Sequence, residues 1–323
     1  MKQTEIILSA TEIKAEAQRL GFYSCGIAPA EPVAEEHRRY FEDWLQQGAY
    51  GSMDYLANHA AMRFDPCELV PSTRSIVCVA LNYYPSEFMD EQEGCLSWYA
   101  YGKDYHEVMK DKLRRLMAYI LNLVPEDAQA EILPGRVFCD TAPVLERYWA
   151  WKAGLGWIGR NHQLIIPQAG STFFLGEIFL TLPVDSYDSP QKNRCGHCRK
   201  CLDACPTRAL TAEGFDARHC LSYLTIENRD EIPQWAAPHM EPCFYGCDRC
   251  QASCPHLRFA RPTQEKEFHL REELKQMTRQ QWQQLSVEDY RKLFRGSAVK
   301  RAKYEGLMRN IRAMNHPDQE LTE

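Results

Sequence analysis

The sequence predicts a mixed α/β (α+β) domain, then an iron–sulfur segment, then a helical C-terminal segment. The run at 75–83, SIVCVALNY, is apolar and rich in β-branched residues, as in a buried central strand. Residues 104–124 carry apolar side chains at helical spacing and predict a long amphipathic helix. Nine of the 14 cysteines lie between 195 and 254. We therefore expect three parts: 1–187, 188–262 and 263–323.

Local signals set the bounds of the elements. Ser9 followed by Glu12 is a capping-box pattern that starts the first helix, which Gly21 ends. After 262 the chain becomes polar and helical, with a similar capping pattern from Ser286 to Asp289. In chain order we expect helices at 10–20, 32–47, 104–124 and 143–153, and strands at 22–28, 75–83, 136–139, 163–166 and 171–182.

Composition limits the class of protein. With 323 residues and 45% hydrophobic side chains, the chain can bury a substantial core. A formal net charge of −6 does not indicate a general nucleic-acid binder, although local basic patches remain compatible with one. No signal-peptide pattern and no apolar run of ~20 residues is present. We expect a cytoplasmic monomer without a membrane partner, in which Cys25, Cys67, Cys78, Cys95 and Cys139 are free thiols.

The cysteine-rich segment contains two runs with [4Fe-4S] spacing. The first, 195–206, reads C-x2-C-x2-C-x3-C-P, and the second, 247–255, reads C-x2-C-x3-C-P. Two clusters need eight thiolates and the runs supply seven, so Cys220 and Cys243 compete for the last place. Zinc needs only four ligands, and disulfides need an oxidising compartment. The pattern favours two [4Fe-4S] clusters and therefore electron transfer.

Asp140 is the first candidate for acid–base chemistry. It follows a predicted strand, at the position where open α/β folds place ligands. In a partly desolvated site its carboxyl could hold a proton and act as a general acid. The alternative is that Asp140 only caps the following helix. The spacing alone does not decide between the two.

Other polar positions allow both a functional and a structural interpretation. Asp104 and His106 stand at the start of the long helix and could bind a ligand. Alternatively, Asp104 only caps the helix and His106 is a surface residue of its first turn. Arg63 could bind a phosphate or form a surface ion pair. The glycines at 154, 156 and 159 match G-x-G-x-x-G, but they leave a helix and enter a strand, so we reject a dinucleotide-binding loop. We expect them to let the backbone approach a flat ligand.

The segment 291–312 is locally basic. It holds eight lysines and arginines, and Glu305 is its one acid. Such a face suits a phosphate backbone, and the alternative is a solvated helix surface.

Taken together, these stretches resemble the epoxyqueuosine reductases. The resemblance rests on YGKDYH (101–106), DTAPVLER (140–147), GLGWIG (154–159), RHCLSYLTIE (218–227), GCDRCQ (246–251) and FRGSA (294–298), and it spans about residues 10–312. It implies a cobalamin-dependent enzyme that reduces epoxyqueuosine at the tRNA wobble position, the last step of queuosine biosynthesis. The implied fold is a nitroreductase-like, cobalamin-binding sheet domain followed by a ferredoxin-like domain with two [4Fe-4S] clusters.

The resemblance also implies roles for single residues. Asp140 matches the proton donor, and Cys220 matches the eighth cluster ligand, which leaves Cys243 spare. One cluster then takes Cys195, Cys198, Cys201 and Cys254, and the other takes Cys205, Cys220, Cys247 and Cys250. Cobalamin contacts are expected from Arg63, Asp104, Tyr105, Asp140, Trp157 and Ser222, and tRNA contacts from His106, Arg147, Lys300, Arg301 and Lys303.

Two further expectations concern partners. The electron donor would be a reductase or a carrier of the flavodoxin or ferredoxin type. Some family members carry a C-terminal helical-repeat domain that helps to hold tRNA, and this chain is expected to be a short form without it. The alternative function is reduction of a small molecule by a related cobalamin and iron–sulfur enzyme, similar to the reductive dehalogenases.

Overall fold

A computed structural model describes residues 6–126 and 135–315. Its centre is a four-stranded sheet in which every neighbouring pair is antiparallel, in the order β1-β2-β7-β4. Because no neighbouring strands run parallel, the argument that placed Asp140 at the carboxyl edge of an open parallel sheet does not apply. The strands are β1 (Ser24–Pro29), β2 (Ser75–Asn82), β4 (Gly135–Phe138) and β7 (Phe173–Leu180).

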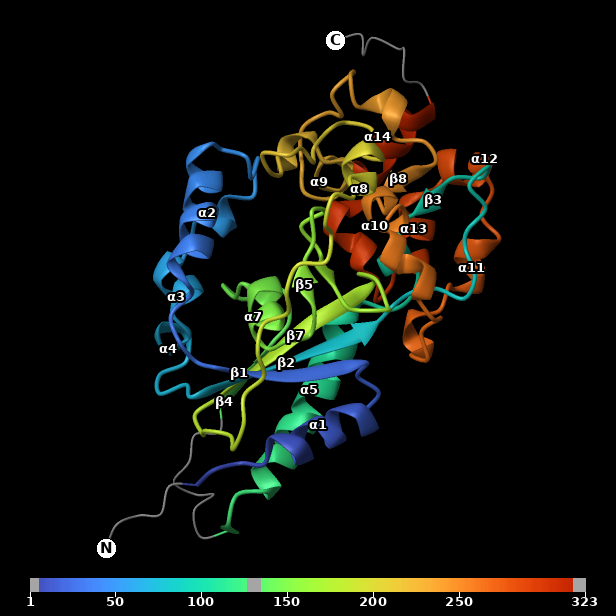
Figure 1. The fold of residues 1–323 in the computed structure, drawn as a ribbon. Helices are drawn as coiled ribbons and strands as arrows, with labels where there is room; N and C mark the ends of the chain where they lie inside the picture. The colour runs from blue at the N-terminus through green and yellow to red at the C-terminus, as the bar shows by residue number, and fades with distance from the viewer. Residues whose placement is uncertain (1–5, 127–134, 316–323) are drawn as a thin grey trace, which may run out of the picture.

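Helices cover both faces of this sheet (Figure 1). On one face, α1 (Ala10–Arg19) and α5 (Tyr105–Asn122) pack on alternate strand residues such as Val77 and Ile178. On the other face, α7 (Glu146–Lys152) packs on the intervening residues, such as Ile76 and Phe179. The strand β2 is buried on both faces, which explains its continuous apolar sequence.

The helix α2 (Glu35–Gln46) buries none of its residues completely and lies to one side of the sheet (Figure 1). It continues into α3 (Ala60–Phe64) and α4 (Pro66–Leu69). The indole of Trp44 donates to the Phe215 carbonyl (2.7 Å), so this region is joined to the cysteine-rich segment.

Short elements make up the remainder of the chain. The short strands β5 (Trp157–Ile158) and β6 (Leu164–Ile165) form a hairpin, and β3 (Cys95–Leu96) pairs in parallel with β8 (Cys243–Tyr245). The later helices are α8 (Lys200–Asp203), α9 (Leu221–Ile226), α10 (Arg249–Ala252), α11 (Glu272–Lys275), α12 (Arg279–Gln283), α13 (Val287–Leu293) and α14 (Lys303–Asn315).

A second hydrophobic core joins three segments that are distant in sequence. Residues between 89 and 101, between 221 and 245 and between 274 and 314 bury their apolar side chains together. The C-terminal helices therefore share a core with the cysteine-rich segment. Within it, the buried guanidinium of Arg309 donates to the carbonyls of Leu224 and Asn228 (2.9 Å each) and of Asp230. Arg309 thus does not belong to the exposed basic face that the sequence predicted.

Two cysteines differ from their prediction. Cys95, expected as a free thiol, forms a disulfide with Cys243, and the bond joins β3 to β8. The two half-cystines are 148 residues apart, so nothing in the local sequence indicated the pairing. Cys243 is consequently unavailable as a cluster ligand in this structure, in agreement with its assignment as the spare cysteine.

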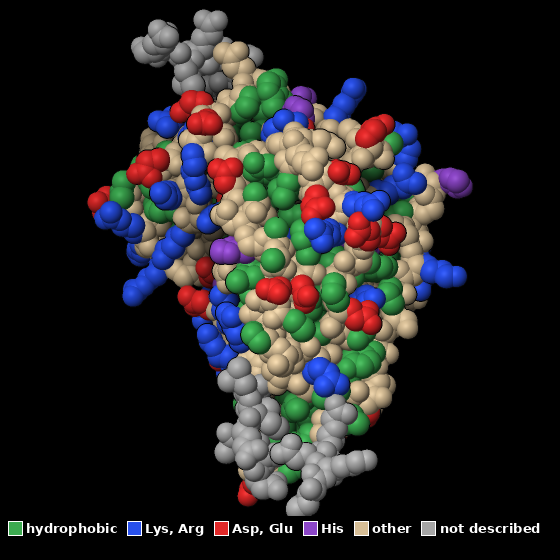
Figure 2. Space-filling view, turned by 90° about the vertical axis from the view of Figure 1, so that its left-hand side faces the viewer, with side chains coloured by type: hydrophobic (Ala, Val, Ile, Leu, Met, Phe, Trp, Pro, Cys, Tyr) green, Lys and Arg blue, Asp and Glu red, His purple; other side chains and the backbone are tan. Residues whose placement is uncertain are grey.

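Two surface properties complete the description. Within 6–126 and 135–315 no helix has the length and apolar character needed to cross a membrane. On the face in Figure 2, acidic and basic side chains are interspersed.

Candidate functional site

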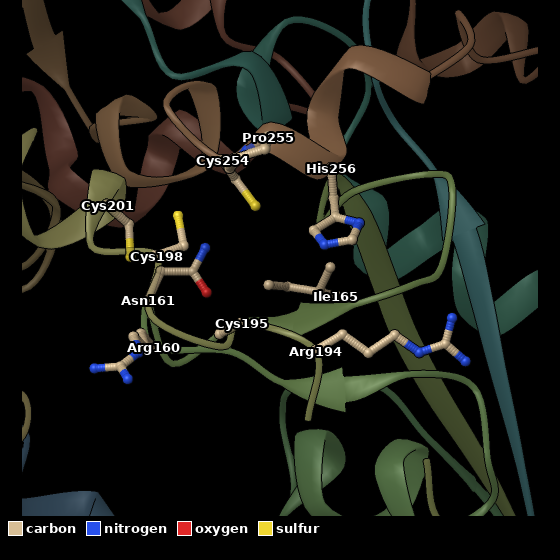
Figure 3. A pocket seen from close by; sticks show the side chains of 10 residues that line it. All are labelled: Arg160, Asn161, Ile165, Arg194, Cys195, Cys198, Cys201, Cys254, Pro255 and His256. Carbon is tan, nitrogen blue, oxygen red and sulfur yellow. The ribbon is translucent and has the colours of Figure 1, made fainter. Parts of the chain in front are cut away.

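Four cysteines line one pocket near the molecular surface. Cys195 and Cys198 come from the loop before α8, Cys201 from α8 itself, and Cys254 from the turn after α10 (Figure 3). They are the four residues that the family resemblance assigned to one cluster. The pocket also contains Asn161, Ile165 and His256.

The other four cysteines form a second, more enclosed set. The pKa of Cys250 is raised by burial and by the nearby Cys247, Cys220 and Cys205, which shows that the four thiols are neighbours. Burial raises the pKa of Cys247 to about 12. Burial and the nearby Cys205 also raise the pKa of Cys220. A thiol with a raised pKa is a poor thiolate until a metal replaces its proton.

The thiols do not converge as they would on a single ion. Within the ranges described, no group of three or more His, Cys, Asp or Glu side chains could hold one metal ion. The first set instead surrounds a pocket. Four thiols around a pocket are compatible with a cluster, in which each cysteine binds a different iron.

A polar site lies where the loop after β4 meets the start of α5. Asp140 Oδ2 accepts from the Tyr105 hydroxyl (2.5 Å) and lies 3.2 Å from His106 Nε2. The opposite ring nitrogen of His106 lies 2.7 Å from Asp104 Oδ1. Asp104 also caps α5 by accepting from the His106 amide, which confirms its structural interpretation, while its contact with the His106 ring places it at this polar site.

Asp140 is not a helix cap. Leu145 occupies the N-cap position of α7, and no side chain caps this helix. Asp140 itself has φ = 57°, a left-handed conformation that is uncommon for an aspartate. Its side chain is 57% exposed, yet burial is the largest influence on its pKa. Protein therefore surrounds a carboxylate that water still reaches, as expected for a group that meets a ligand.

The charges of this site differ from the sequence expectation. Although burial opposes ionisation, the hydrogen bonds from His106 and Tyr105 lower the pKa of Asp140 below its ordinary value. Burial likewise opposes the charge on His106, but the carboxylates of Asp104 and Asp140 raise its pKa to about 9. Near neutral pH the proton therefore resides on His106, and Asp140 is ionised, not protonated as the sequence argument assumed.

Two further acids were not singled out from the sequence. Burial and the charge of Asp140 raise the pKa of Glu146 to about 8, and its carboxyl accepts from the Asp140 amide. Glu177 is fully buried in β7, neither of its oxygens has a hydrogen-bond partner, and its pKa is raised by burial and by Glu146. An acid inside the apolar run 173–180 was the available sequence signal for Glu177.

Arg63 is buried and lies beside Tyr55. Its Nε has no hydrogen-bond partner, its guanidinium lies 5.5 Å from the Phe41 ring centroid, and burial lowers its pKa. The alternative of a surface ion pair is therefore wrong. Tyr55 in turn contacts Arg301 (5.7 Å from the ring centroid), and the charges of Arg301 and Asp140 both influence the pKa of Tyr55.

The remaining predicted residues are dispersed. Arg147 donates to the His162 carbonyl near the Asp140 site. Ser222 lies in the first turn of α9 beside Cys220, whereas Trp157 is buried and donates from its indole to Cys195 Sγ (3.5 Å). Of the basic residues, Lys300 and Lys303 are exposed, and Arg301 forms an ion pair with Glu227 (2.6 Å).

The glycine-rich loop packs against a neighbouring strand of the same protein. A Cβ on Gly156 would lie 2.1 Å from the Ile165 carbonyl oxygen, and one on Gly159 would lie 2.4 Å from the Ile165 side chain. The glycines permit the tight β5–β6 hairpin, so the expected close approach is to a neighbouring strand. The loop enters a strand, which agrees with the rejection of a dinucleotide-binding motif.

Comparisons with known proteins identify relatives over almost the whole chain. The family model "Epoxyqueuosine reductase QueG, DUF1730" matches residues 63–141, and "4Fe-4S double cluster binding domain" matches 194–256. A protein of Leadbetterella byssophila named epoxyqueuosine reductase is 47% identical over 300 residues, which cover 93% of this chain and 96% of that protein.

Solved structures agree with this similarity. An epoxyqueuosine reductase with an epoxyqueuosine-modified tRNA-Tyr stem loop has a TM-score of 0.78 at 26% identity, covering 94% of this chain and 80% of the other. The enzyme of Bacillus subtilis, in a structure with its catalytic aspartate loop swung out of the active site, gives 0.76 at the same identity and coverage.

Proposed function

The chain belongs to the epoxyqueuosine reductases, and we propose that it converts epoxyqueuosine at the wobble position of tRNA to queuosine. The reaction takes up two electrons and two protons, replaces the epoxide by an alkene and releases water. The observation that carries the proposal is the Asp140–His106 pair, in which His106 holds a proton beside an accessible carboxylate, in a chain that also has two cysteine sets. A tRNA substrate is favoured over a small molecule because a relative holds a modified tRNA stem loop.

The first proton would come from this pair. His106 holds it in the resting enzyme, and Asp104 orients the ring through Nδ1. Asp140 bridges His106 and the solvent-facing side, so it can take the proton from Nε2 and transfer it to the epoxide oxygen as the C–O bond breaks. Tyr105, whose pKa is strongly raised by burial and by Asp140, remains a donor and holds the carboxylate in place.

The second proton has a source next to the first. After one C–O bond breaks, the oxygen must take up another proton to leave as water. Glu146 carries a proton at neutral pH because burial and Asp140 raise its pKa to about 8, and it contacts the Asp140 amide. We assign it the supply of that proton.

The residues present fit a cobalamin in one respect that can be checked. Arg63 is a buried guanidinium with an unpartnered Nε, and it pairs with no carboxylate in the part of the chain that the structure describes. Such a cation suits an anionic group such as the phosphate of the nucleotide tail. Arg63, Tyr105, Asp104 and Ser222 are the residues that would hold it. When bound, cobalamin would supply a strongly reducing cobalt centre. Trp157 contacts Cys195 instead, so we assign it to the first cluster.

The tRNA would be held by the exposed basic residues of 291–303 together with Arg147. Lys300 and Lys303 are free to contact phosphates, whereas Arg301 is fixed by Glu227 close to Tyr55 and Asp140. We therefore infer that Arg301 faces the modified nucleoside and that the two lysines face the backbone.

The test is anaerobic turnover. Enzyme reconstituted with iron, sulfide and cobalamin is incubated with a strong reductant and epoxyqueuosine-containing tRNA, and the nucleosides are separated by mass. We expect queuosine from the native chain and none from Asp140→Asn, with unchanged iron content and tRNA affinity in the variant. Product formation by the variant would remove Asp140 from the reaction, and failure of the native chain would refute the function.

A further inference from the structure

The rim of the first cysteine set carries exposed positive charge. Lys192, Arg194, Arg199 and Lys200 flank Cys195 and Cys198 within nine residues, and all four are exposed. Asp203 is the nearest acid in sequence and pairs with Arg199 at 3.7 Å. On a chain with a net charge of −6, this local reversal of sign indicates a surface for a negatively charged partner.

Two arginines beside the first cysteine set, Arg194 and Arg160, contact uncharged groups. The guanidinium of Arg194 lies 5.8 Å from the Trp157 ring centroid, and Arg160 donates to the Gly196 carbonyl (2.9 Å). Both line the pocket with the four cysteines (Figure 3). Neither forms an ion pair with a carboxylate among the residues that the structure describes, so their charges are held in place without being neutralised.

All eight cysteines of the two sets are partly exposed, but the residues around the sets differ. The first lies among exposed residues, including His197 and the rim lysines. The second lies among buried ones, such as Leu221 and Asp248. Glu227, at the end of the helix that follows Cys220, pairs with Arg301, whose charge acts on Asp140. The second set is therefore linked to the side of the protein that holds Asp140, and the first set is bordered by exposed cations.

We propose that this rim, formed by Arg160, Lys192, Arg194, Arg199 and Lys200, is the docking surface for an acidic one-electron carrier protein. The inference rests on the proposed function, because that reaction needs two electrons. Each docking event would oxidise the carrier's flavin or [2Fe-2S] group by one electron and reduce the first cluster from [4Fe-4S]2+ to [4Fe-4S]+. Two events supply the pair of electrons for one epoxide. The pocket residue Pro255 adds apolar contact area beside the charges.

An RNA backbone could also meet a basic surface. The protein carrier is favoured because the rim surrounds the accessible thiols, whereas the tRNA must reach Asp140. A third possibility is structural, since cations beside a cluster can tune its reduction potential without docking a partner. The experiment separates these three possibilities.

The test uses cobalamin-free enzyme with both clusters assembled. Flavodoxin hydroquinone and, separately, a reduced [2Fe-2S] ferredoxin are mixed with the enzyme under anaerobic stopped flow, and bleaching of the clusters is followed. The variant is Lys192→Glu with Lys200→Glu, whose side chains form no ion pair among the described residues. The matched control is Lys300→Glu with Lys303→Glu, and photoreduced deazaflavin serves as a neutral reductant that needs no docking.

We expect the rim variant to lower the second-order rate with at least one carrier by ~10-fold or more at low salt, and the native rate to fall as salt rises. Reduction by deazaflavin and tRNA affinity should be unchanged in the rim variant, while the control should lose tRNA affinity and keep the carrier rate. Lys192→Gln with Lys200→Gln should show a smaller effect of the same sign, and iron analysis checks assembly.

Three results would overturn the proposal. An unchanged rate with both carriers would remove the docking surface, equal slowing with deazaflavin would indicate tuning of the cluster, and loss of tRNA affinity in the rim variant would assign the face to RNA. A native enzyme that accepts electrons through the rim but forms no queuosine would refute the proposed function while leaving the docking surface intact.

Discussion

Replacing His106 with glutamine tests where the catalytic proton is held. Glutamine keeps a polar side chain near Asp104 and Asp140 but cannot carry the proton. In the native site the carboxylates raise the pKa of His106 to about 9, so at pH 8 the pair holds its proton. Without the ring, the proton must reside on Asp140 alone.

The size of the effect follows from this difference. An aspartate with an ordinary pKa of ~4 is protonated in only about one molecule in 10⁴ at pH 8. General-acid catalysis contributes ~10²–10⁴-fold, which limits the loss. We expect the single-turnover rate of His106→Gln at pH 8 to fall by ~10²–10⁴-fold, and the deficit to shrink by up to ~10-fold for each pH unit below that.

The assay is single-turnover queuosine formation from pH 6 to 9.5, with tRNA binding measured alongside. The native rate should fall as the pH rises through about 9. The variant should already be falling across the whole range, with tRNA affinity within ~2-fold of the native value. If the variant keeps the native alkaline limb, the proton is not held on His106 and the assignment is refuted.

The same substitution has a consequence for stability. Because folding raises the pKa of His106 from its ordinary value of ~6.5, its contribution is fully present below pH 6.5 and is lost as the pH rises through about 9. The side chain is 27% exposed, and we expect at most ~3 kcal/mol. The difference in melting temperature between the two cofactor-free chains should therefore shrink from pH 6.5 to 10.

Three other substitutions test separate parts of the structure. Glu146→Gln keeps an acceptor for the Asp140 amide but cannot donate a proton in the same way. The single-turnover rate should therefore fall by ~10-fold or more while tRNA affinity stays constant. An unchanged rate would exclude Glu146 as a proton source. Arg309→Met removes the donor of two buried carbonyls and one partly buried carbonyl and should cost ~3–5 kcal/mol in urea unfolding. The exposed Arg312→Met should cost less than ~0.5 kcal/mol, and equal effects would contradict the buried network. Cys220→Ser should lose iron from the second cluster whereas Cys243→Ser should not, and the opposite iron contents would exchange the two assignments.

Local sequence patterns predicted the elements well because their signals are local. The run at 75–83 became β2, and the caps at Ser9 and Ser286 both accept the expected amides. The antiparallel order of the sheet was missed because strand pairing joins residues about 45 to 105 positions apart. Burial of Arg309 was missed for a related reason, since its carbonyl partners lie about 80 residues away.

The sequence predicted which residues form the candidate site but not which of them are charged. The YGKDYH and DTAPVLER strings supplied Asp104, Tyr105, His106 and Asp140, which the structure brings together. Sequence could not assign the proton, because a pKa depends on hydrogen bonds and burial that arise only when the two strings meet. The role of Glu146 was hidden for the same reason, although it lies within the second string.

The contact between α14 and α9 bears on when the protein can acquire its metal. Arg309 and Asn310 hold carbonyls of α9, the helix that begins directly after Cys220. During synthesis α14 is the last of the described helices to leave the ribosome. Until it does, the carbonyls of α9 lack the Arg309 and Asn310 donors, although the earlier helices have already emerged. Cys220 would be fixed in position only after α14 is released. The second cluster should therefore be inserted only after α14 has been released, and a nascent chain stalled before residue 303 should bind at most the first.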